Sequence, residues 1–328
     1  MNTFLPHSEP LLFTLLVMGI AVCGGFMITR INDLRTGRIF AWVFVIVNTV
    51  AVERICSNEP AGFRMLAIIA VMLYSIKSIV CIEAFARDHV RLSFSTWLVF
   101  TLFWFGMNPR IFVGPFNKPF SDSGKIFFLG LTNFLVGALL VLSANLIADQ
   151  FPHGLSEKIT CTILLLTGLS LMLHFGLLNM SAGILRYKGV NAHKLFNAPI
   201  RSSSLTEFWG KRWNIAFSEM ASQIIYRPLI GPLGKTTALV SAFLLSGLLH
   251  EAAISLPVKT GFGLPMVYFV LHAVLMQIEQ KLEKENRAIN KKTGLGRCWT
   301  IFWLVAPAPL LFHSYFLKGI IWPIIGLT

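Results

Sequence analysis

Long apolar stretches separated by short polar segments are the most regular feature of this sequence. An α-helix rises about 1.5 Å per residue, so about 20 apolar residues cross the roughly 30 Å core of a bilayer. The pattern predicts nine membrane-spanning helices, at Leu11–Thr29, Ile39–Val52, Met65–Ile82, Phe94–Met107, Ile126–Ala148, Ile159–Met180, Thr236–Leu256, Phe262–Ile278 and Trp299–Leu317. Ile39–Val52 and Phe94–Met107 are short, so we expect each to tilt into the protein or to extend beyond these bounds.

Composition places the chain among membrane proteins. Of its 328 residues, 55% are hydrophobic and 13% are charged, and the mean hydropathy is +0.69. Soluble domains carry about 25% charged residues. We therefore expect a single all-α integral membrane domain over residues 1–328, with about nine transmembrane helices. The five cysteines are scattered and show no spacing typical of a disulfide framework or a metal site.

The net charge of +13 arises from Lys and Arg that flank the apolar stretches. Cytoplasmic loops collect these residues, so we expect a lipid bilayer and no nucleic acid as the partner. With nine spans, the loops on the N-terminal side hold 19 Lys and Arg, and the opposite loops hold eight. This distribution predicts a cytoplasmic N-terminus, with the long basic loop from Arg186 to Lys235 on the same side. The membrane would be the endoplasmic reticulum in a eukaryote and the cytoplasmic membrane in a bacterium.

A polar pair lies deep in one apolar stretch. His250 is roughly 21 Å into a helix that starts at Thr236, and Glu251 follows it. An ionisable residue at the bilayer centre costs about 2.5–3.5 kcal/mol, so such residues usually face a cavity or a partner. Burial favours neutral His, the form that accepts a proton from a hydroxyl as a general base. Ser246, one turn earlier, leaves room for a substrate, and Glu251 is expected to orient a neighbouring group.

The long basic loop contains an aromatic and cationic run, Phe208-Trp-Gly-Lys-Arg-Trp-Asn214. Trp209 and Trp213 are four residues apart, which suits a helix lying at the membrane interface with its cations toward the headgroups. Asn214 offers an amide donor for a carbonyl oxygen that becomes negative during acyl transfer. The basic residues of this region are candidate contacts for anionic phosphate groups: Arg201, Lys211 and Arg212.

Three motifs together resemble a known family. Phe208-Trp-Gly-Lys-Arg-Trp-Asn214, followed by Ser246-Gly-Leu-Leu-His-Glu251, is similar to the paired signature of wax synthase-type enzymes. These enzymes belong to the membrane-bound O-acyltransferase superfamily, alongside sterol and diacylglycerol acyltransferases. Gly106-Met-Asn-Pro109 is similar to the Gly-Met-x-Pro stretch of wax synthases. The resemblance extends from about Trp104 to Leu256.

The resemblance implies a catalytic role for His250 and an assisting role for Asn214. It also implies that the helices enclose a buried catalytic chamber with a tunnel open to cytosolic acyl-CoA as co-substrate, with no metal and no other cofactor. A zinc site of the His-Glu-x-x-His type would need His at position 254, which is Ile254. Residues around the catalytic pair are expected to bind substrate: Trp209, Arg212, Trp213, Ser246 and Glu251.

The depth of His250 also restricts the acceptor. The acceptor hydroxyl must reach this residue through apolar surroundings, where each buried CH₂ contributes about 0.8 kcal/mol. A sugar or a peptide would have to lose strong hydration there. We therefore expect an apolar alcohol, most simply a long-chain fatty alcohol that gives a wax ester. Sterols, diacylglycerol and terpenoid alcohols satisfy the same argument.

A multi-span transporter is the alternative from another functional class. It would use His250, Glu251 and Lys77 as an intramembrane relay. Transporters often contain inverted repeats, and the sequence has no matching halves. A scaffold protein is a third interpretation, and it leaves the buried His-Glu pair unexplained. We expect His174 and His272 to be helix-contact residues, and Lys77 to extend its amine toward the membrane surface.

Overall fold

The computed structural model describes residues 4–86, 90–114, 116, 118–150, 154–285 and 293–327, and all the regular secondary structure among them is helical. The longer α-helices are α1 (Ser8–Ile28), α2 (Leu34–Ile55), α3 (Ala61–Ala84), α5 (Ser123–Gln150), α6 (Leu155–Ser170), α7 (Leu178–Tyr187), α10 (Arg227–His250), α12 (Leu264–Lys284) and α13 (Thr293–Val305). Short helices complete the fold: α4 (Phe94–Leu98), α8 (Leu205–Glu207), α9 (Ile215–Ala221), α11 (Leu256–Val258), α14 (Ala308–Leu311) and α15 (Ser314–Phe316). The expectation of an all-α membrane protein is confirmed.

Six helical stretches of the described chain are long and apolar enough to cross a membrane: Ser8–Ile28, Ala61–Ala84, Ser123–Gln150, Leu155–Tyr187, Ile215–Val258 and Gly294–Leu311. The expected count of nine is therefore not supported. Two of the missing spans lie in α2 and α12, which have the length but carry charged residues toward their ends. The third, Phe94–Met107, contains only the short apolar helix Phe94–Phe103.

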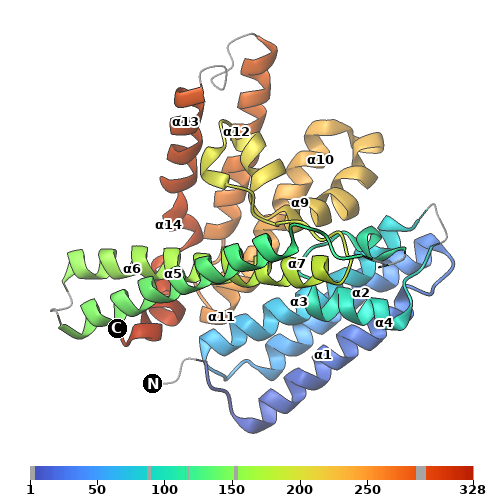
Figure 1. The fold of residues 1–328 in the computed structure, drawn as a ribbon, viewed down its shortest axis with the longest axis horizontal. Coiled ribbons are helices and arrows are strands. Elements are labelled where there is room, and N and C mark those ends of the chain that lie inside the picture. The colour runs from blue at the N-terminus through green and yellow to red at the C-terminus, as the bar shows by residue number, and fades with distance from the viewer. Residues whose placement is uncertain are drawn as a thin grey trace.

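Helices α1, α2 and α3 pack side by side as a three-helix bundle (Figure 1). The most deeply buried of the three is α3, and Lys77 in its C-terminal half has 0% exposure. The Lys77 amine donates hydrogen bonds to the backbone carbonyls of Phe100 and Trp104. The expectation that Lys77 extends to the membrane surface is therefore wrong. Lys77 instead fixes the segment after α4 against α3, because buried carbonyl oxygens need donors.

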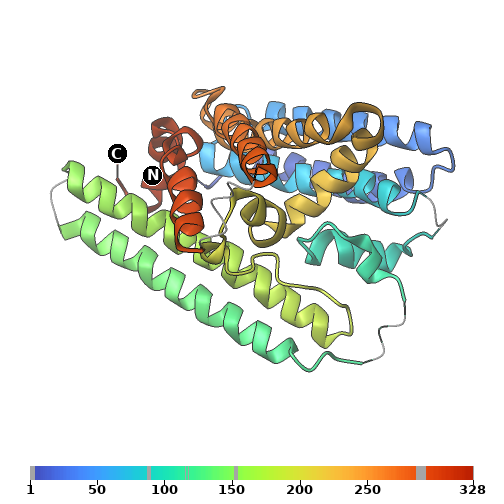
Figure 2. The same cartoon turned by 90° about the horizontal axis from the view of Figure 1, so that it is seen from above.

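A second unit is the long hairpin of α5 with α6 and α7. A π-helical stretch (Leu171–Leu177) joins α6 to α7 without a break. Figure 2 shows this hairpin apart from the α1–α3 bundle, with the short helices near residue 210 between the two. The helices approach closely where glycines face each other: a Cβ at Gly137 would lie 2.5 Å from the Gly168 carbonyl oxygen. Small residues allow such backbone contact between membrane helices.

The two ends of the α1–α3 bundle have different neighbours. At one end, His7 before α1 meets Glu59 of the α2–α3 turn, with His7 Nδ1 3.0 Å from Glu59 Oε1. At the other end, the bundle and the loop that contains residues 208–214 share one cavity, to which each contributes lining residues: Arg38, Glu83, Gly210 and Ile215. The N-terminus and this loop therefore lie at opposite ends of the bundle.

This placement differs from the expectation that the N-terminus and the basic loop share one side. The cause lies in the segment from Phe94 to Arg110, which begins and ends at the same end of the bundle. Ala84 ends α3, and its carbonyl accepts a hydrogen bond from the Arg110 guanidinium. The chain therefore returns after η1 (Val99–Phe103) to the end of the bundle at which the segment began.

The close approach of α5 and α6 makes a prediction about stability. We expect Gly137→Ala to lower the free energy of unfolding by about 1–3 kcal/mol, because the new methyl group meets backbone that cannot move aside. Gly124→Ala on the same helix is the matched control, since a Cβ there meets nothing within 4 Å. Thermal unfolding in detergent, followed by circular dichroism, measures both. Equal melting temperatures for the two variants would contradict the close contact.

Candidate active site

Asn214 lies at a sharp break between two short helices. The π-helix η5 (Phe208–Arg212) ends before it, and α9 begins after it. Asn214 adopts the left-handed conformation, with φ 43° and ψ 61°, which Asn tolerates better than most residues. Its side-chain Oδ1 accepts the Phe217 N–H at 3.2 Å and caps α9. The cap fixes the amide plane, so the Nδ2 group remains available to donate to a ligand.

The aromatic residues of this region face the protein interior. Trp209 packs against Phe243 and Phe269, with ring centroids 6.0 and 5.7 Å away. Trp213 stacks on Phe208 at 5.4 Å. The two tryptophans therefore do not line one face of an interfacial helix, as their four-residue spacing had suggested. The helix η5 ends at Arg212 and Trp213 is already extended, so Trp209 and Trp213 do not share a helix face, and each indole enters a different part of the core.

His250 is the last residue of α10, and the π-helix η7 (Glu251–Ser255) follows it directly. Its Nδ1 lies 2.7 Å from the Ser246 carbonyl oxygen. A carbonyl oxygen only accepts, so this bond assigns the proton to Nδ1 and leaves the Nε2 lone pair free. The ring lies against Phe269, 4.4 Å between centroids, and Phe217 is 6.2 Å away. Apolar rings thus hold a hydrogen-bonded imidazole whose free nitrogen is basic.

Asn214 and His250 line the same cavity, which we call the chamber. It has a volume of about 470 Å³ and a mainly apolar wall, and its lining also includes Trp209, Trp213 and Ser246. Several lining segments are π-helical, a local form that often occurs at functional sites: His174 in Leu171–Leu177, Trp209 and Gly210 in Phe208–Arg212, Ser222 and Tyr226 in Ser222–Tyr226, and Ile254 in Glu251–Ser255. A few polar groups converge in an apolar cavity, which is typical of a small-molecule site.

His174 also lines the chamber, although the sequence suggested only a helix contact. Its Nδ1 is 3.1 Å from the Ser170 hydroxyl. The ring packs against Phe196 at 4.8 Å and meets Trp213 edge to face at 5.7 Å. A polar residue within the apolar run Ile159–Met180 was the available signal in the sequence, but nothing there shows that its helix faces Asn214.

A second cavity lies on the other side of α9, and we call it the arginine cavity. Its volume is about 710 Å³, and its lining is rich in charged and amide side chains: Arg38, Glu83, Asn108, Arg110, Glu219, Gln223 and Arg227. Gly210, Ser218 and Ser222 line both the arginine cavity and the chamber. The two cavities are therefore neighbours across one short helix. The phosphate candidates Arg201, Lys211 and Arg212 line neither cavity.

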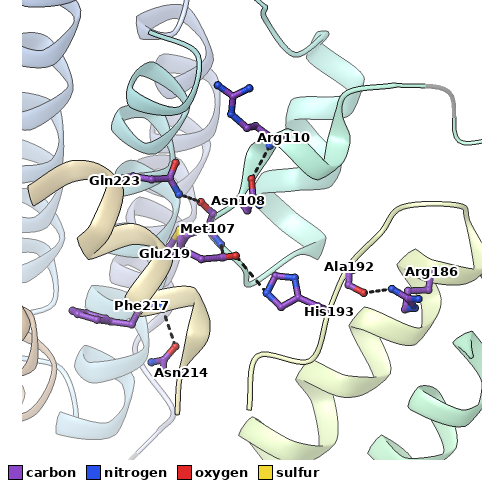
Figure 3. A network of polar contacts seen from close by, with 10 residues as sticks. All are labelled: Met107, Asn108, Arg110, Arg186, Ala192, His193, Asn214, Phe217, Glu219 and Gln223. Carbon is purple, nitrogen blue, oxygen red and sulfur yellow. Dashed lines mark hydrogen bonds and ion pairs between the residues drawn. The ribbon is translucent and has the colours of Figure 1, made fainter. Parts of the chain in front are cut away.

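Gly210, Ser218 and Ser222 form the boundary between the two cavities. The Gly106–Pro109 segment is bonded to α9 and to the π-helix Ser222–Tyr226, which carry Ser218 and Ser222 (Figure 3). The Met107 N–H donates to Glu219 Oε2 at 3.3 Å, and Gln223 Nε2 donates to the Met107 carbonyl at 2.9 Å. His193 Nε2 lies 3.4 Å from the other oxygen of Glu219. Both backbone groups of Met107 are thus paired with one helix turn, so this segment braces α9 behind Asn214.

Arg212 and Glu251 are outside the chamber wall and have structural partners. The Arg212 guanidinium pairs with Glu207 at 2.7 Å. The Ser203 N–H, and then Arg212, hold the pKa of Glu207 below its usual range. Glu251 Oε1 accepts the backbone N–H groups at the start of α12, from Gly263 at 2.9 Å and Met266 at 3.0 Å.

A further carboxylate was not singled out by the sequence. Glu279 of α12 accepts the N–H groups of Leu205 and Thr206, at 2.8 and 3.1 Å, and the Trp299 indole N–H at 3.0 Å. It lies in a charged segment that gave no sign of chemistry. Its contacts join α8, α12 and α13. Glu279, near the C-terminal end of α12, therefore fixes the start of the segment that leads into residues 208–214.

Comparison with known proteins supports the same region. Residues 192–271 match the membrane bound O-acyl transferase family. A long-chain-alcohol O-fatty-acyltransferase of Simmondsia chinensis is 30% identical over 33% of this chain and 33% of its own length. A probable long-chain-alcohol O-fatty-acyltransferase 6 of Arabidopsis thaliana is 26% identical over 37% of this chain and 40% of its own length. An acyl-CoA–sterol O-acyltransferase 1 of Arabidopsis thaliana is 26% identical over 32% of each chain.

These alignments cover less than half of each of these three relatives. The family match contains both Asn214 and His250. The resemblance to wax synthase-type proteins of the membrane-bound O-acyltransferase superfamily is thereby confirmed. The comparisons give no support to the transporter interpretation.

The contacts of Glu251 predict the effect of two substitutions. Glu251→Ala removes the acceptor for two N–H groups of α12 and should lower the free energy of unfolding by about 1–3 kcal/mol. Glu251→Gln keeps an acceptor oxygen and should retain most of the stability. Thermal unfolding of the purified variants measures the difference. If Glu251→Gln is as unstable as Glu251→Ala, the negative charge matters more than the bond to α12.

Proposed function

We propose that this chain is a membrane-embedded O-acyltransferase that transfers an acyl group from acyl-CoA to the hydroxyl of an apolar alcohol. One observation carries the proposal: the Asn214 amide and the His250 imidazole line a single apolar chamber. The names of the relatives support an alcohol acceptor, most simply a long-chain fatty alcohol that gives a wax ester. The whole sequence then acts as one membrane domain, residues 1–328.

The reaction follows from the hydrogen bonds of the two residues. His250 Nε2 removes the proton of the alcohol, since Nδ1 is committed to the Ser246 carbonyl. The alcohol oxygen bonds to the thioester carbon, and the carbonyl oxygen becomes negative. Asn214 Nδ2 stabilises this oxyanion, because its Oδ1 is held by the Phe217 N–H. The C–S bond then breaks, the ester is released, and the CoA thiolate takes the proton from His250.

The two neighbouring cavities suit the two parts of acyl-CoA. The anionic nucleotide end fits the arginine cavity, where Arg110 and Arg227 provide positive charge and Arg38 is paired with Glu83. The thioester would cross the boundary at Gly210, Ser218 and Ser222 to reach the chamber. Small and hydroxyl-bearing residues at this boundary leave room for a narrow, polar pantetheine arm. No metal or other cofactor is part of this proposal.

The distribution of cations supports an orientation in which the arginine cavity faces the cytosol. Helices α2 and α12 run alongside spanning neighbours, so we propose that they cross the membrane too, giving eight crossings. Among the described residues, with each Lys and Arg taken at the nearer helix end or in the adjoining connection, 18 lie on the side of the arginine cavity and five lie on the opposite side, while Lys77 is inside α3. The positive-inside rule then orients residues 208–214 to the cytosol and the N-terminus to the opposite side.

Two substitutions separate the roles in the chamber. We expect His250→Ala to reduce kcat by about 10²–10⁴-fold, and Asn214→Ala by about 10²–10³-fold through loss of oxyanion stabilisation. Ester formation from acyl-CoA and hexadecanol by the purified variants measures both. Near-normal turnover in His250→Ala would show that this residue is structural, and the proposed reaction would then have no general base.

The arginine cavity makes a prediction about acyl-CoA affinity. Arg227→Glu should raise the KM for acyl-CoA at least tenfold, because it reverses a charge in the cavity lining. The wild-type KM should rise with salt, since charge attraction is screened. Arg201→Glu is the matched control, because Arg201 is exposed and lines neither cavity. A similar KM for acyl-CoA in both variants would show that the nucleotide does not bind in this cavity.

Cysteine labelling tests the orientation. In a cysteine-free chain expressed in a bacterial cytoplasmic membrane, an impermeant thiol reagent should modify Ser57→Cys and spare Ser203→Cys. Ser57 belongs to the α2–α3 turn, at the same bundle end as His7. Ser203 is part of the loop at the opposite end. Labelling of Ser203→Cys from outside intact cells would reverse the orientation.

A further inference from the structure

His174 gives the chamber a second imidazole that the proposed reaction does not use. It comes from the α5–α7 hairpin, whereas Asn214 and His250 come from other elements, at the start of α9 and the end of α10. The ring contacts of the two histidines are also separate. His174 contacts Phe196 and Trp213, while His250 contacts Phe217 and Phe269. The chamber therefore has two polar positions on different parts of an apolar wall.

The orientation of the His174 ring is fixed. Ser170 lies one helical turn earlier, and its hydroxyl is 3.1 Å from Nδ1. Two aromatic rings hold the imidazole faces and edge. If the Ser170 hydroxyl donates to Nδ1, the ring proton is on Nε2, which is then a donor. If the hydroxyl accepts from Nδ1–H, Nε2 is an acceptor. In both cases a ligand that fills the chamber excludes water from Nε2. The ligand then either forms a hydrogen bond with this nitrogen or leaves it buried without a partner, which costs binding free energy.

The position of His174 points to the acceptor alcohol and not to acyl-CoA. The chamber meets the arginine cavity at Gly210, Ser218 and Ser222, and His174 is not part of that boundary. The pantetheine arm of acyl-CoA would enter at the boundary, and its acyl chain has no polar group for an imidazole. The hydroxyl that reacts must lie at His250. The ligand group left for His174 is a second polar group on the alcohol.

Resting on the function proposed above, we infer that His174 is a specificity-determining residue that binds a second hydrogen-bonding group of the acceptor. The preferred acceptor is then an apolar alcohol with a second hydroxyl or similar group along its body. A plain fatty alcohol is still a substrate, but it buries His174 Nε2 unpaired. A lost hydrogen bond to a buried polar group corresponds to a discrimination of about tenfold or more.

A competition assay measures this preference. The full-length protein in lipid nanodiscs receives palmitoyl-CoA and an equimolar mixture of hexadecanol with one hexadecanediol. The second hydroxyl is placed in turn at C2, C6, C10 or C16. The ratio of the two monoesters, read by mass spectrometry, equals the ratio of kcat/KM values and does not depend on the amount of folded protein. We expect at least one diol to be favoured about tenfold over hexadecanol, well above the twofold statistical advantage of two hydroxyls.

Variants assign the preference to the imidazole nitrogen. His174→Phe keeps a ring between Phe196 and Trp213 but removes both nitrogens, so the ratio should fall to about two. His174→Gln restores a hydrogen-bonding group and should recover part of the ratio. Met276→Leu changes the apolar wall of the same chamber, and its ratio should stay near that of the wild type.

The possible failures are distinguishable. If every diol is used within twofold of hexadecanol, or if His174→Phe keeps the wild-type ratio, His174 has no role in acceptor choice and the inference is wrong, while acyl transfer stands. If the wild-type protein forms no ester from any of these alcohols, the proposed function fails and the inference fails with it.

Discussion

A polar group buried among membrane helices has no water to bond, and leaving it unpaired costs several kcal/mol. This constraint accounts for how four polar side chains in and around the chamber are fixed, because each of them is bonded to a backbone group. His250 donates to the Ser246 carbonyl, and Asn214 accepts the Phe217 N–H. Glu251 caps α12, and Lys77 holds two carbonyls of the segment after α4. The bonds that satisfy these groups also orient the atoms that remain free.

The same constraint explains why the chamber is built from broken helices. Helical breaks and π-helical turns free backbone groups, which the side chains of neighbouring elements then satisfy. Asn214 sits at such a break, and Glu219 and Gln223 pair both backbone groups of Met107 just behind it. A wall of this kind is apolar enough for a lipid alcohol and still presents an amide and two imidazoles. The arginine cavity on the other side of α9 complements it with charge.

Much of the site could be predicted from the sequence, because its signal is local. A histidine and a glutamate in an apolar run, and an asparagine after an aromatic run, stand out without any structure. Features that depend on distant packing could not be predicted. His174 occupies an ordinary apolar helix, and only the tertiary fold brings it to Trp213. Arg212 belongs to the motif yet pairs with Glu207, while Arg38 and Arg227 come from segments without a motif.

The fold shows the same division between local and distant information. Helix type follows from hydropathy, and the all-α class was correct. The number of crossings depends on whether a marginal stretch such as Phe94–Met107 spans or returns, and hydropathy does not decide that. The return is fixed by the bonds of Lys77 and Arg110 to backbone carbonyls. One such stretch changes which loops share a side, so the side of each loop depends on distant contacts that hydropathy does not contain.

The most direct test of this account is the structure of the protein with a non-reactive acyl-CoA analogue, in which a methylene group separates the sulfur from the carbonyl carbon. Cryo-electron microscopy in nanodiscs would locate both ends of the ligand. The account predicts the nucleotide beside Arg38, Arg110 and Arg227, and the ketone oxygen within hydrogen-bonding distance of Asn214 Nδ2. A ligand whose carbonyl lies outside the chamber, or whose nucleotide lies at the bundle end near His7, would contradict it.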